Sequence, residues 1–63
     1  MTWEREAEYN VARIEEMLAA AKTAAADGNL RTFMSKMHNI SVHASAAETR
    51  AYAVHMQSKG KGP

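Results

Sequence analysis

One glycine, Gly28, is the only helix-breaking residue in the first 59 positions of this 63-residue chain. The uninterrupted stretches on either side are rich in Ala, Glu, Met, Lys and Arg, which lose little side-chain entropy in a helix. Gly28 can take the left-handed conformation that closes a helix, and Asn29 and Thr2 can cap the starts of helices. The sequence therefore predicts a single hairpin over 1–63, with a helix over 3–26, a turn at 27–29, a helix over 30–58 and a flexible basic tail at 59–63.

Apolar residues recur at alternating spacings of three and four along both stretches, which is the pattern of a coiled-coil seam. The short connection makes the two helices antiparallel neighbours. We expect an all-α fold, an antiparallel two-helix hairpin. Its expected hairpin and dimer core consists of Ala7, Val11, Ile14, Leu18, Ala21, Phe33, Met37, Ile40, Ala44, Ala47, Ala51 and Val54, with Ala25 and Leu30 continuing the seam at the turn.

The composition indicates that one hairpin has too little core to stand alone. Alanine supplies 13 residues, whereas Leu, Ile, Val and Phe together supply only 8. Chains below about 70–80 residues usually need a disulfide, a metal or oligomerisation. The chain has no cysteine, and His38, His43 and His55 lack the i, i+4 spacing that places two imidazoles on one helical face. We therefore expect no metal and no cofactor, and a homodimer that forms a four-helix bundle.

The second helix carries another apolar stripe, roughly 160–200° from its seam at 100° per residue. A helix that is apolar on two opposite faces is expected to be covered on both. The expected partner interface on this stripe consists of Val42, Ala46, Thr49, Tyr52, Ala53 and Met56. It can serve the homodimer or a foreign protein. The alternative is that its alanines merely favour helix and that Val42 and Met56 are scattered surface residues.

Residues suited to catalysis do not come together in this pattern. Ser41 and Ser45 flank His43, but residues two apart on a helix point to different faces. We therefore expect a non-enzymatic protein that binds another protein as a regulator or inhibitor, of the kind that phages and mobile elements encode. No stretch approaches the roughly 18 apolar residues of a membrane span. The acidic start, Met1-Thr2-Trp3-Glu4, is unlike a signal peptide, so we expect a cytoplasmic location.

Three basic residues at seven-residue intervals, Lys36, His43 and Arg50, form an edge beside the seam of the second helix. Residues 1–27 carry six acids and three bases, while residues 28–63 carry five bases and one acid. The basic edge can therefore pair with the acidic first helix. The alternative is that it contacts the phosphates of a nucleic acid.

The expected architecture resembles the plasmid-encoded Rop/Rom family of RNA-binding regulators in its short length and helical hairpin, with local matches at Met1-Thr2, Asn10 and Ala12-Arg13. The resemblance implies a dimeric four-helix bundle whose RNA-contacting face lies on the first helix and combines basic, amide and aromatic residues. Only Asn10 carries over. The other corresponding positions hold Trp3, Ile14, Leu18 and Ala25. RNA binding is thus an alternative function, and a small-ligand-binding oligomer is another.

Overall fold

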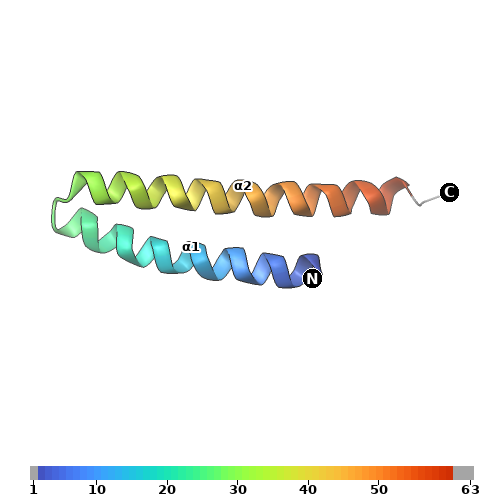
Figure 1. Ribbon diagram of the computed structural model, residues 1–63, viewed down its shortest axis with the longest axis horizontal. Coiled ribbons are helices and arrows are strands. Elements are labelled where there is room, and N and C mark those ends of the chain that lie inside the picture. The colour runs from blue at the N-terminus through green and yellow to red at the C-terminus, as the bar shows by residue number, and fades with distance from the viewer. Residues whose placement is uncertain (1, 61–63) are drawn as a thin grey trace.

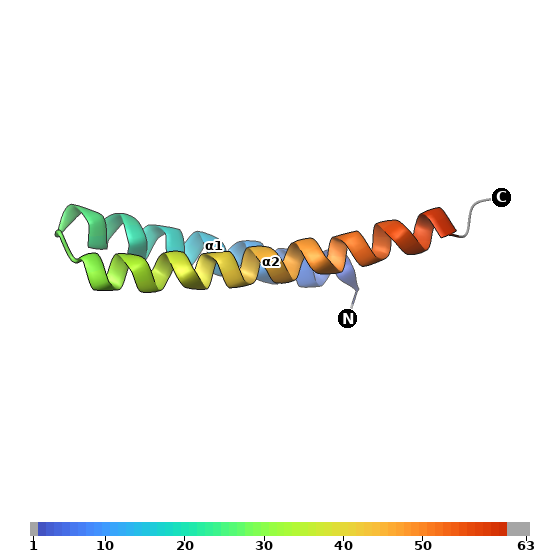
Figure 2. The same cartoon turned by 90° about the horizontal axis from the view of Figure 1, so that it is seen from above.

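The computed structural model describes residues 2–60 as two helices joined by a short turn. Helix α1 spans Trp3–Ala26 and helix α2 spans Leu30–Gly60. The helices lie side by side and antiparallel in a rod of 55 × 16 × 14 Å, and the last turns of α2 project beyond the start of α1 (Figure 1). Seen from above, the two helices cross at a shallow angle (Figure 2). An all-α helical hairpin is thereby confirmed.

The start of each helix is capped by the residue that the sequence predicts. The Thr2 hydroxyl accepts a hydrogen bond from the backbone N–H of Arg5 at 3.4 Å. The Asn29 side-chain oxygen accepts one from the backbone N–H of Thr32 at 3.1 Å. Each cap satisfies one of the backbone donors that the first turn of a helix leaves without an intrahelical acceptor.

The turn is built around Gly28, which has a φ of 71°. Its N–H donates to the carbonyl of Ala25 at 3.1 Å, and the N–H of Asn29 donates to the carbonyl of Ala24 at 2.8 Å. These two bonds form the Schellman motif, in which a left-handed residue satisfies the last carbonyls of a helix. The left-handed conformation predicted for Gly28 is confirmed. The second helix ends at Gly60 rather than at residue 58, and residues 61–63 of the predicted tail lie outside the described residues.

On both helices, alternate positions of the expected seam remain in the contact between the helices, and the residues one position earlier replace the others. Met17, Ala21 and Ala24 are the buried residues of the described part of the chain, and Met17 and Ala24 were not in the expected core. Half-buried positions from the expected core are Ala7, Ile14, Phe33, Ile40, Ala47 and Val54. The remaining expected core residues, Val11, Leu18, Met37, Ala44 and Ala51, are exposed in the single hairpin, as are Ala25 and Leu30.

Candidate functional site

A polar layer crosses the contact between α1 and α2. Nδ1 of His43 lies 2.9 Å from Oδ1 of Asn10, and Nδ2 of Asn10 donates to the carbonyl of Glu6 at 3.0 Å. Because the amide oxygen is only an acceptor, Nδ1 of His43 is the donor in this bond. The ring of Tyr9 meets the His43 ring edge-on, with centroids 6.3 Å apart. A half-buried polar pair at this point favours one register of the hairpin over its neighbours.

The basic edge lies at this same contact rather than on the side of α2 that faces away from α1. Lys36 and His43 are half-buried, and Nε of Arg50 donates to Oε2 of Glu6 at 2.9 Å. The acidic first helix thus engages Arg50 by an ion pair, and Asn10 engages His43 by a hydrogen bond. This arrangement leaves less of the basic edge available to an external phosphate.

The exposed remainder of the expected core gathers on one side of the hairpin, and we call it the paired face. Its members on both helices are Val11, Leu18, Leu30, Met37, Ala44 and Ala51. Val11 is 52% exposed, Leu18 44%, Leu30 70% and Met37 41%. Both helices therefore contribute to one apolar surface, which residues 2–58 leave exposed.

The geometry of antiparallel helices explains why these residues share one side. Val11 follows the contact residue Asn10 by one position, and Ala44 follows the contact residue His43 by one position. One residue turns a side chain by about 100° about the helix axis. Viewed from one end, antiparallel helices wind in opposite senses, so both 100° turns lead to the same side of the hairpin.

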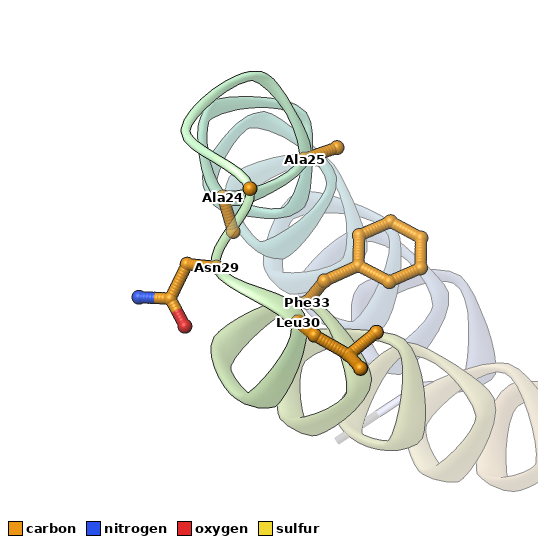
Figure 3. Close-up of a pocket in the computed structure, with 6 residues that line it drawn as sticks. Ala24, Ala25, Asn29, Leu30 and Phe33 are labelled. Atoms are coloured by element: carbon orange, nitrogen blue, oxygen red, sulfur yellow. The ribbon is translucent and has the colours of Figure 1, made fainter.

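Two shallow depressions at the ends of the hairpin agree with this placement. Near the turn, Ala25 and Leu30 line a depression of about 220 Å³ together with Phe33. Figure 3 shows the Phe33 ring reaching across towards α1 below Ala25, while the Asn29 side chain points away on the other side. At the open end, Trp3 and Ala51 line another depression. Each depression joins residues of both helices.

The predicted outer stripe of α2 is exposed along its length. Val42 is 51% exposed, Tyr52 63% and Met56 45%. Ala46, Thr49 and Ala53 are exposed as well. The structure places these residues on α2 alone, away from α1, so they form a narrower surface than the paired face.

Other kinds of site receive no support from the described residues. No group of three or more His, Asp or Glu side chains within residues 2–58 is placed to hold a metal ion. Neither helix, over its described length, is long and apolar enough to cross a membrane.

The sequence contains a signal for the buried stripe of α1, but this signal does not distinguish it from the neighbouring stripe. Asn10, Met17 and Ala24 recur every seven residues, directly beside the stripe of Val11 and Leu18. The polar Asn10 hides this second repeat until its hydrogen bond to the other helix is seen.

Comparison of the chain with models of protein families, with curated proteins and with solved structures finds no match. Its exposed surfaces are therefore the guide to its function.

Proposed function

We propose that this chain is a non-enzymatic cytoplasmic protein, which forms a homodimeric four-helix bundle and regulates or inhibits another protein by binding it. The observation that carries the proposal is that few hydrophobic side chains are buried inside the hairpin, while many are exposed on its surface. Among the described residues, one methionine and two alanines are buried, whereas ten large hydrophobic side chains are exposed. Four of them, Val11, Leu18, Leu30 and Met37, lie on the paired face, and apolar residues gathered on one surface are typical of protein association sites.

The surface area supports a second copy as the first occupant. The hairpin exposes 5053 Å², whereas a folded monomer of its mass, 6.9 kDa, exposes roughly 4,000 Å². The difference, about 1,000 Å² per chain, is close to the roughly 800 Å² that each partner buries in a standard interface. A single layer of two helices has this excess because each helix is covered on one side only.

The two exposed surfaces suit different occupants. The paired face draws on the heptad positions of both helices, as the core of a four-helix bundle does. We therefore assign it to the second copy. The outer stripe lies on α2 alone and stays exposed in such a bundle, so we assign it to the regulated protein.

A protein is a better candidate than RNA for the second partner. Arg50 is paired with Glu6, and Lys36 and His43 are half-buried against α1. Nucleic-acid binding depends on lysine and arginine that are free to neutralise phosphates. The apolar side chains of the outer stripe, such as Val42 and Met56, suit a protein surface instead.

The dimer is tested by the mass in solution, measured by sedimentation equilibrium. We expect twice 6.9 kDa for the wild-type chain. Leu18→Glu places a charge on the paired face and should shift the mass to that of one chain. Ala12→Glu is the matched control, because Ala12 is exposed on the same helix and lies away from that face. A wild-type monomer, or a dimeric Leu18→Glu variant, would contradict the assignment.

The outer stripe is tested separately with Val42→Glu and Ala53→Glu, each checked for helicity by circular dichroism. We expect both variants to remain dimeric and to lose a protein that the wild-type chain retains in a pull-down. Gln57→Glu, an exposed position on α2 outside the stripe, should retain that protein. If both variants keep every bound protein, the stripe is not the binding surface. If they become monomeric, the stripe belongs to the dimer instead.

A further inference from the structure

We propose that the second copy lies on the paired face with its turn at the opposite end of the bundle, so that the two hairpins are antiparallel. This inference rests on the proposed dimer and specifies how its copies are oriented. A symmetric pair placed face to face has two choices. Rotation about the long axis puts both turns at one end, and rotation about an axis across the bundle puts them at opposite ends. The two choices bring different side chains together.

The pair Glu6–Arg50 fixes which residues of one chain lie at the same distance from the turn. At that register, Leu18 shares a level with Met37, whose side chain is also large. Farther from the turn, Val11 shares a level with Ala44, and both of these are smaller. At these two levels, the paired face is therefore bulkier on the side of the turn than on the side away from it.

Antiparallel copies bring the level with large side chains of one chain against the level with smaller side chains of the other. Leu18 and Met37 then meet Val11 and Ala44 of the second copy, so both central layers hold one leucine, one methionine, one valine and one alanine. Copies with their turns together would stack two Leu18 with two Met37 in one layer and leave the next layer short of volume. Layers of even volume are needed for a core packed at native density.

The same orientation continues to the ends of the bundle. Leu30, at the turn end of α2, meets Ala51 of the second copy, at the open end of its α2. Leu30 is the most exposed large hydrophobic residue of the paired face, at 70%. A small residue opposite it leaves room for its side chain to be covered.

Charged residues along the rim of α1 favour the same orientation. Glu8, Glu15 and Lys22 follow one another at seven-residue intervals, and Glu8 and Glu15 line one depression together with Val11. In antiparallel copies, Glu8 lies opposite Lys22 of the second copy, and symmetry repeats this attraction. Glu15 then meets its own counterpart at the centre, which is one repulsion against two attractions. With the turns together, Glu8 would instead lie level with Glu48 of the second copy.

The orientation also places the two outer stripes. In antiparallel copies, α2 of each chain lies beside α2 of the other, so both outer stripes flank one side of the bundle. In copies with their turns together, α1 would separate the two α2 helices and the stripes would face opposite directions. The proposed dimer thus offers the regulated protein one side with two equivalent surfaces.

Spin labels measure the orientation directly, because the chain has no cysteine of its own. Asp27→Cys and Glu15→Cys each carry one label per chain, at the turn and at the middle of α1. In antiparallel dimers the Asp27 labels should be at least roughly 36 Å apart, the length of 24 helical residues. The Glu15 labels should be the nearer pair. A shorter distance for Asp27 than for Glu15 would overturn the inference while leaving the dimer intact.

A charge exchange provides the second test, which does not depend on labelling. Glu8→Lys should weaken the dimer roughly tenfold, since it turns two exposed attractions into repulsions. Adding Lys22→Glu should restore wild-type affinity. If Glu8→Lys strengthens the dimer, and Lys22→Glu does not reverse the effect, the turns lie together and the inference is wrong. A wild-type chain that sediments as a monomer would overturn the proposed dimer itself.

Discussion

The side chains of Asn10 and His43 meet across the two helices through a hydrogen bond of 2.9 Å between Oδ1 and Nδ1. The Asn10 amide nitrogen is held at the same time by the carbonyl of Glu6, at 3.0 Å. The backbone of α1 thereby orients the amide so that its oxygen faces α2. This relationship sets the rotation of α1 and distinguishes the observed contact from the neighbouring stripe of Val11 and Leu18.

Loss of this bond should lower the free energy of unfolding measurably. We expect Asn10→Ala to cost about 1 kcal/mol in urea unfolding, because it leaves the half-buried His43 nitrogen without its protein acceptor. His43→Ala should cost a similar amount. The double variant should cost less than the sum of the two, with a coupling of about 0.5–1.5 kcal/mol. All samples should share one concentration, since dimerisation contributes to stability. Additive effects would show that the pair is not coupled.

Substitution at Gly28 should act through the backbone alone. Apart from its two chain neighbours, no residue has an atom within 4 Å of the position that a Cβ would take at Gly28, so the cost comes from its φ of 71°. Gly28→Ala is expected to destabilise the hairpin by about 1–2 kcal/mol. Gly28→Asn, the matched control, should cost less because asparagine tolerates the left-handed region better. Thermal unfolding followed by circular dichroism compares the two, and equal costs would contradict the role given to the conformation.

Enlarging the side chain at Ala21 should disrupt the contact between the helices. Ala21 is only 2% exposed, because it lies in the contact between α1 and α2. Ala21→Leu should cost about 1–3 kcal/mol of unfolding free energy, as overpacking of a filled interior does. Ala19→Leu adds the same atoms at an exposed position and should change stability little. If the two variants unfold alike in urea, the contact is not as close as described.

The ion pair between Glu6 and Arg50 should contribute little and depend on salt. Its side chains remain 36% and 46% exposed, and pairs of this kind are worth about 0.2–1 kcal/mol. Arg50→Gln should therefore lower the unfolding free energy by less than about 1 kcal/mol at low ionic strength. The difference should shrink in 1 M salt, where the Debye length is about 3 Å. A difference that persists at high salt would indicate another role for Arg50.

The helix boundaries could be predicted because a few residues leave little local choice. Gly28 supplies the left-handed turn, and the side-chain oxygens of Thr2 and Asn29 satisfy the first backbone donors of each helix. Each of these signals involves residues that lie close together in the sequence, so it can be recognised without knowledge of the tertiary structure. The end of α2 has no such local signal, because lysine and glycine near residue 60 can either continue a helix or end it.

The rotation of α1 could not be predicted from periodicity. Met17 and Leu18 are adjacent and similar in size, as are Ala24 and Ala25, so two seven-residue stripes compete for the place facing α2. The free energy gained by burying apolar side chains is nearly the same for the two stripes, so it does not decide which of them faces α2. The polar bond of Asn10 favours its own stripe, and that bond becomes visible only when the opposite residue is known.

Trp3 gives the open end of the hairpin a property that the rest of the chain lacks. It is the single tryptophan, it is 41% exposed, and it borders a depression together with Ala51 and Val54 of α2. Gly28 and its neighbours tether the opposite end covalently, so separation of the helices begins beside the indole. A red shift of its emission therefore reports opening of this end, while circular dichroism reports total helix. Trp3 is therefore an intrinsic fluorescence probe for the separation of the two helices at the open end.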